Sequence, residues 1–80
     1  MSTLPVKQFN AIATDIKVNS EMLRVHLSDG RIISVPIEWF PKLRDASEKE
    51  RNNWRIIGGG IGVHWEDIDE DLSVMGLLQL

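Results

Sequence analysis

The residues best suited to chemistry in this sequence are one histidine and the acids that follow it. His64 precedes Asp67, Asp69 and Asp71, and the three aspartates recur at every second position. An imidazole nitrogen and carboxylate oxygens bind divalent metals and transfer protons. This set therefore allows a small metal-dependent enzyme or a metal-binding protein, and whether the chain is an enzyme stays open on this pattern alone.

The aspartate spacing also resembles the start of a calcium-binding loop of the EF-hand type. Counted from Asp67, the sixth position of such a loop needs glycine and the twelfth needs glutamate. The chain has Leu72 and Leu78 at those positions, which excludes an EF-hand. A looser cation site at the acidic run is one remaining interpretation. The simpler alternative is a solvated acidic turn that caps a helix, with Ile68 and Leu72 facing inward.

Two other patterns that often carry chemistry do not match their motifs. The glycines at positions 58, 59, 60 and 62 have neither the spacing of a dinucleotide-binding loop nor the Lys-Ser/Thr of a phosphate loop. A tight turn or bulge explains them better, because glycine adopts backbone angles that other residues avoid. His64 and Asp67 could belong to a catalytic triad, but no serine lies in the sharp turn that a nucleophile requires.

The segment from His64 to Asp71 also has the composition of a protein-binding surface. Five of its residues are acidic, and mutual repulsion makes such crowding unfavourable unless a helix N-terminus, a cation or a basic partner relieves it. Tryptophan is the residue type that most often anchors protein interfaces. We therefore predict a partner surface formed by Trp65, Asp67, Glu70 and Asp71.

Composition excludes several classes of function. The 80 residues include no cysteine, which rules out disulfides, cysteine-bound zinc, iron–sulfur clusters and thiol nucleophiles and favours the cytoplasm. The net charge is −3 and the nine Lys and Arg residues are scattered, so direct nucleic-acid binding by this module alone is not expected. No apolar run approaches the roughly 18 residues of a membrane span, so we expect no membrane association. No motif calls for a cofactor.

The elements that position these residues begin with an antiparallel meander. Apolar residues alternate with polar ones over residues 11–18 and 22–27, which predicts two strands, the first with Ile12, Thr14, Ile16 and Val18 on its inner face. A three-residue loop ending at Gly30 joins the second strand to a third. This loop pairs Val25 with Ile33 and places Leu23, Val25, Leu27, Ile33 and Val35 on one buried face.

The second half of the chain predicts short helices and another hairpin. Pro41 suits the first turn of a short helix, and Ser47 with Glu50 forms a capping box that opens a second helix. The glycine cluster joins residues 55–57 to 61–65 as a hairpin or a bulged strand. The acidic run is then expected to lead into a short closing helix.

In several ordered motifs the sequence resembles the bacterial family filed as domain of unknown function 2442. The resemblance covers about residues 12–78 and is most specific in the ending H-W-x-x-[IL]-D-E-D-[IL]-S-V. Less specific motifs precede this ending: Asp29-Gly30-Arg31, Val35-Pro36, Trp39-Phe40-Pro41-Lys42-Leu43 and Glu50-Arg51-Asn52-Asn53-Trp54. One more, Leu77-Leu78, follows it. The resemblance implies no enzyme activity or cofactor. It implies small bacterial and phage proteins, often encoded beside another small protein as toxin–antitoxin pairs are, and some with a helix-turn-helix domain after this module.

Together these patterns predict a single small α+β domain over residues 1–80, with flexibility of residues 1–9 left open. The fold is an antiparallel meander of about three to five strands with two or three short helices packed on one face. We expect a non-enzymatic protein-interaction or regulatory module, antitoxin-like or the sensory part of a transcription regulator. The expected partner is a small toxin-like protein encoded nearby. A homodimer is also expected, because the core is small and sheet edges need covering.

Overall fold

The first half of the chain forms a three-stranded antiparallel sheet. The computed structural model describes residues 11–80, so the expectation for residues 1–9 lies outside the described residues. Strands β1 (Ala13–Val18), β2 (Met22–Leu27) and β3 (Ile32–Pro36) lie in the order β1-β2-β3. Val25 pairs with Ile33 and Leu23 with Val35, which confirms the predicted register. Gly30 has a φ of 94°, as its place in the loop requires.

Strand β1 departs from the simple alternation that its sequence suggests. Its pairing with β2 shifts register between Ala13 and Asp15, which is a β-bulge at Thr14. Ala13 and Ile16 are therefore the buried residues, and Thr14 is exposed. The prediction that Thr14 faces inward is wrong, because a bulge inserts one residue and reverses the faces that precede it.

Short helical segments connect the two halves of the molecule. They are the 3₁₀ turn η1 (Ile37–Trp39) and the helices α1 (Pro41–Arg44) and α2 (Glu48–Asn52). Pro41 occupies the first turn of α1, as predicted. The Ser47 hydroxyl accepts a hydrogen bond from the backbone N–H of Glu50, whose carboxylate accepts one from the N–H of Ser47. The predicted capping box is therefore present.

The second half forms another three-stranded antiparallel sheet, made of β4 (Trp54–Ile57), β5 (Gly62–Trp65) and β6 (Glu70–Ser73). The turn η2 (Gly58–Gly60) joins β4 to β5, and all three of its glycines have positive φ. A side chain at Gly60 would lie 2.5 Å from Cβ of Ile12, so this position requires glycine for space as well as for backbone angle.

The acidic run does not lead into a helix, contrary to expectation. Residues 66–69 form the turn of the β5–β6 hairpin, and the acids continue into strand β6. The closing helix α3 (Val74–Leu78) begins three residues after Asp71, the last acid of the run, and is capped by the hydroxyl of Ser73, which accepts from the N–H of Gly76. The helix dipole is therefore not what stabilises these carboxylates.

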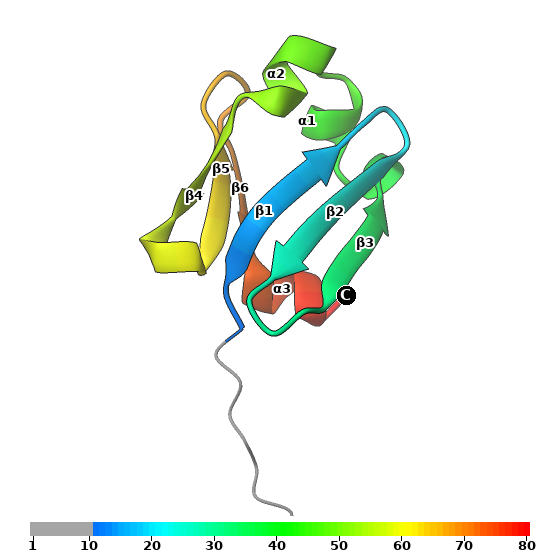
Figure 1. The fold of residues 1–80 in the computed structure, drawn as a ribbon. Coiled ribbons are helices and arrows are strands. Elements are labelled where there is room, and N and C mark those ends of the chain that lie inside the picture. Colours follow the sequence, from blue (N-terminus) through cyan, green and yellow to red (C-terminus); the bar gives the residue numbers. More distant parts are fainter. Residues whose placement is uncertain (1–10) are drawn as a thin grey trace, which may run out of the picture.

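The two sheets face each other across one hydrophobic core, and helices close the molecule at its ends. Figure 1 shows α1 and α2 at one end with the β5–β6 turn, and α3 at the other end with the β4–β5 turn. The predicted α+β class is confirmed. None of the helices over residues 11–80 is long and apolar enough to cross a bilayer. The core comprises Ala13, Ile16, Leu23, Val25, Leu27, Val35, Ile37, Leu43, Val63, Trp65, Val74 and Leu77.

Candidate functional site

The β5–β6 hairpin carries every residue of the predicted partner surface. Its register pairs His64 with Asp71 and Trp65 with Glu70. Side chains alternate between the two faces of a strand, so His64 lies on the outer face while Trp65 lies on the inner face. Asp69 completes the turn with a φ of 49°, a backbone angle that aspartate tolerates better than most residues.

Trp65 is a core residue and not part of any surface. Its side chain is completely buried, and its indole N–H donates a hydrogen bond to the backbone carbonyl of Arg51 at 2.9 Å. The prediction that Trp65 anchors a partner is therefore wrong. Its ring fills the space between the two sheets, and the hydrogen bond ties the end of α2 to strand β5. The remaining predicted residues are Asp67, Glu70 and Asp71.

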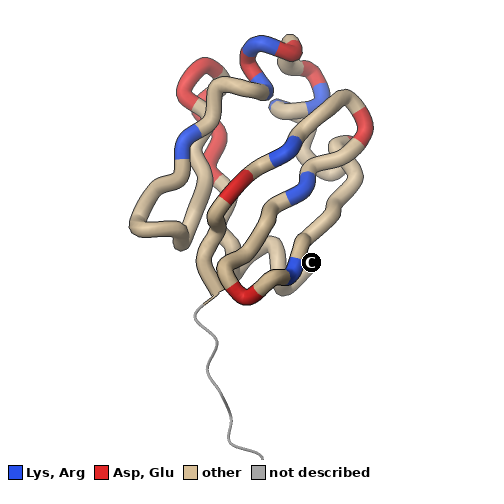
Figure 2. The backbone as a smooth tube through the Cα atoms, in the orientation of Figure 1, with Lys and Arg blue, Asp and Glu red and all other residues tan. Residues whose placement is uncertain are grey.

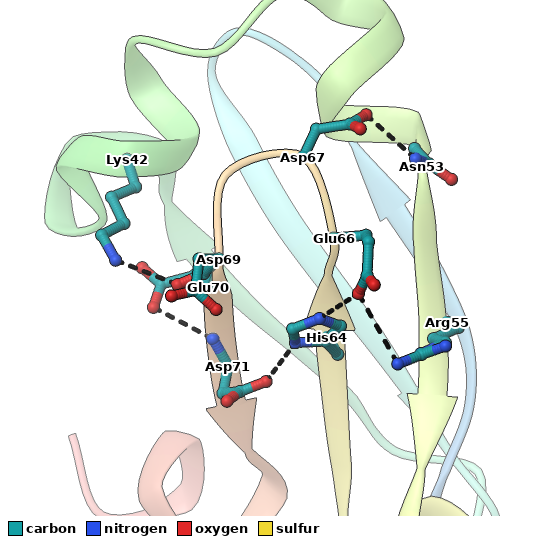
Figure 3. Close-up of polar contacts among 9 residues, drawn as sticks. All are labelled: Lys42, Asn53, Arg55, His64, Glu66, Asp67, Asp69, Glu70 and Asp71. Atoms are coloured by element: carbon teal, nitrogen blue, oxygen red, sulfur yellow. Dashed lines mark hydrogen bonds and ion pairs between the residues drawn. The ribbon is translucent and has the colours of Figure 1, made fainter.

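His64 is held between two carboxylates on the outer face of the second sheet. Its Nδ1 lies 2.5 Å from Oδ1 of Asp71, and its Nε2 lies 2.5 Å from Oε2 of Glu66 (Figure 3). Only 14% of the His64 side chain is exposed. The hydrogen bond to Asp71, followed by that to Glu66, raises the pKa of His64 above its ordinary value, against the opposing effect of partial burial.

Arg55 extends this arrangement onto strand β4. It pairs with His64 across the sheet, and its guanidinium Nη2 lies 3.6 Å from Oε2 of Glu66. Figure 3 shows Arg55, His64 and Asp71 side by side on three neighbouring strands, with Glu66 above the histidine. When His64 is protonated, the series of contacts from Arg55 through Glu66 and His64 to Asp71 alternates positive and negative groups, which suits a structural charge network on a sheet surface.

The turn of the β5–β6 hairpin is hydrogen-bonded to the end of α2 and to α1. Asn53 donates a hydrogen bond from its side-chain amide to the carboxylate of Asp67 at 2.9 Å. Lys42 donates from Nζ to the backbone carbonyl of Asp69 at 3.0 Å. These contacts fix the position of the turn but leave both aspartates exposed to solvent.

The geometry does not assemble the metal site that the sequence allows. Asp71 contacts His64, whereas Asp67 turns toward Asn53 and Asp69 lies beyond the sheet edge near Lys42 (Figure 3). Within residues 11–80, no three His, Asp or Glu side chains lie close enough together to hold a metal ion. Both ring nitrogens of His64 are engaged by carboxylates, so neither is free to act as a general base. The predicted set of His64, Asp67, Asp69 and Asp71 is therefore not a metal site.

Sequence reasoning missed Glu66 and Arg55 as the companions of His64. Two signals could have found them. His64 and Glu66 are two positions apart, so their side chains point to the same side where the backbone is extended. The glycine turn, read as a hairpin, would also have placed Arg55 opposite His64, as observed.

The carboxylates gather at one end of the molecule. Figure 2 shows acidic residues along the β5–β6 turn and basic and acidic residues mixed around α1 and α2, whereas the β4–β5 turn carries no charge. We use the term acidic surface for Glu66, Asp67, Asp69, Glu70 and Asp71. All of these residues except Glu70, which is half-buried, are exposed.

Comparisons with known proteins give a family but no activity. No curated protein matches the chain. A protein of unknown function from Rhodospirillum rubrum, known from a crystal structure, shares 31% sequence identity and a TM-score of 0.75, and the match covers 86% of each chain. The family model described as protein of unknown function, DUF2442, matches residues 13–80. The chain therefore belongs to the DUF2442 family.

Proposed function

We propose that this protein is a non-enzymatic protein-interaction module that binds a basic protein partner through its acidic surface. The observation that supports the proposal is the incomplete compensation of the five carboxylates. Glu66 contacts both Arg55 and His64, and Asp71 contacts His64, so both carboxylates have a basic partner. The carboxylate of Asp67 accepts from a neutral amide, that of Glu70 accepts from the backbone N–H of Asp71, and Asp69 is exposed. These three charges lie on one hairpin, which favours steering and orienting a basic partner.

The partner that best fits this surface is a small toxin-like protein whose basic groove binds nucleic acid. An acidic surface can occupy such a groove in place of phosphates, and the toxin would then be inactive. This gives the chain an antitoxin-like role. The cytoplasm is a suitable compartment, because a chain without cysteine does not depend on an oxidising environment.

The decisive experiment removes charge from the acidic surface without changing its shape. The triple variant Asp67→Asn, Asp69→Asn, Glu70→Gln keeps the acceptor for Asn53 and a residue that tolerates positive φ at position 69. The probe is the purified product of the gene adjacent to that of this chain, and binding is measured by calorimetry. We expect a loss of affinity of at least about tenfold, with a weaker dependence on salt.

A matched control distinguishes the effect of the acidic surface from the effect of the protein's net charge. The variant Glu21→Gln, Glu38→Gln, Glu48→Gln removes the same three charges from exposed positions outside the hairpin. It should bind like the wild type. Equal losses in both variants would show that only net charge matters. Unchanged affinity in the hairpin variant would contradict the proposal.

A further inference from the structure

An apolar hollow lies at the end of the molecule opposite the acidic surface. It has a volume of about 390 Å³ and lies between the β4–β5 turn, helix α3 and the start of β1. We call this the apolar end. Its lining residues are Ala11, Ile12, Gly58, Gly59, Ile61, Val74, Met75 and Leu78.

Large apolar side chains on its rim are exposed to an unusual degree. Ile61 and Met75 are each 66% exposed, and Leu78 is 42% exposed. Scattered exposed apolar residues are normal on a protein surface, but several around one hollow indicate a contact surface.

A backbone hydrogen bond joins the two sides of the apolar end, and the space between them stays open. The backbone N–H of Val74 donates to the carbonyl of Ile61 at 2.9 Å, which joins the β4–β5 turn to helix α3. The glycines of the turn add no side chains, and nothing lies within 4 Å of the position that a side chain at Gly59 would take. A pre-formed surface of this kind loses little conformational entropy on binding.

The distribution of charged residues favours a second copy of this chain as the molecule that covers the apolar end. Residues 56–63 and 72–80 contain no charged residue, although 26% of the whole chain is charged (Figure 2). A two-fold contact places a surface against its own copy, so a surface that carries charges of one sign would bring like charges together. With a net charge of −3, two copies can meet through these two uncharged segments and keep their acidic surfaces apart.

We propose that the apolar end is a homodimer interface, in which Ile61, Met75 and Leu78 of one copy pack against the same end of a second copy. The two acidic surfaces then lie at the outer ends of the dimer. Each dimer could hold two basic partners, or one partner with two equivalent sites, with a gain from avidity.

The test is sedimentation equilibrium of the full chain from low to high micromolar concentration. We expect association toward twice the chain mass of 9.1 kDa. Ile61→Glu and Met75→Glu should each weaken dimerisation by at least about tenfold, because both would place like charges within the contact. Trp39→Glu is the matched control, since Trp39 is 58% exposed but lies outside the hollow, and it should dimerise like the wild type.

Every other outcome overturns the proposal. Monomeric wild type at all concentrations would do so directly, as would dimers that persist in both variants. Should Ile61→Glu fail to fold, Met75→Glu decides alone, because Met75 lies on a helix surface.

The alternative to a second copy is that the chain's own residues 1–10, which precede Ala11 in the lining of the hollow, cover the apolar end. A monomer that Met75→Glu destabilises to heat, when Trp39→Glu does not, would identify that segment instead.

Discussion

His64 and Asp71 face each other across strands β5 and β6 with 2.5 Å between Nδ1 and Oδ1. This pair, with Glu66 on the other ring nitrogen, stabilises the protonated imidazole in the folded state and raises the pKa of His64. In the unfolded chain the carboxylates are no longer held against the ring. The pKa of His64 is therefore higher in the folded than in the unfolded protein.

This difference predicts how stability depends on pH. The contribution of His64 is fully present below its unfolded pKa of about 6.5 and is lost as the pH rises through the higher folded pKa. The free energy of unfolding should thus decrease over the range just above pH 6.5, and His64→Gln should flatten this dependence. Chemical denaturation at a series of pH values measures both.

Proton NMR of the His64 ring gives a direct check. Asp71→Asn should lower the pKa of His64 more than Glu66→Gln does, because the hydrogen bond to Asp71 is the larger cause of the raised value. A titration midpoint at or below 6.5 in the wild type would contradict the arrangement.

Trp65 should be among the residues most sensitive to substitution. Trp65→Phe removes the hydrogen bond to the Arg51 carbonyl and leaves unfilled volume between the sheets. We expect a loss of about 2–3 kcal/mol in the free energy of unfolding. Trp39→Phe serves as the control, since that side chain is mostly exposed, and its change should stay within about 0.5 kcal/mol. Equal effects would show that Trp65 is not a core residue.

Two glycines with similar backbone angles should differ in their response to alanine. Gly30 has a φ of 94° and open space around it, so Gly30→Ala should cost only the backbone term of about 1–2 kcal/mol. Gly60 has a φ of 109°, and its new methyl group would also collide with Ile12. Gly60→Ala should therefore exceed Gly30→Ala by at least about 1 kcal/mol, measured by urea denaturation. Similar losses would indicate that Ile12 moves aside freely.

The sequence predicted the first sheet better than the second. The register of β2 and β3 follows from local information, because apolar alternation and the Gly30 loop agree on a single pairing. The bulge at Thr14 was not predictable, since it depends on Ser28 and Ile12 meeting across the hairpin, where Ser28 donates its N–H to the Ile12 carbonyl. The acidic strand β6 was also missed, because Asp and Glu are uncommon in strands.

In the candidate site too, the local sequence predicts some features, whereas others depend on contacts between distant segments. Asp67, Glu70 and Asp71 stand out by composition alone, and the structure places them on one hairpin. Alternation along β5 indicates that Trp65 shares the inner face of Val63, but the burial of the whole ring could not be inferred, because the partner of its N–H is the Arg51 carbonyl on another element. A tryptophan suits a core edge and an interface equally well, and only tertiary contacts distinguish the two.

The connectivity of the two sheets has a consequence for how the chain folds. Within each sheet of residues 11–80 the strands pair with their neighbours in sequence, so the hairpins close through short loops, and docking one sheet onto the other is the step that joins distant segments. Folding should therefore be fast for a protein rich in strands. Because the core needs the inner faces of both sheets, neither half can complete it alone, and the burial of the core is completed only in that docking step.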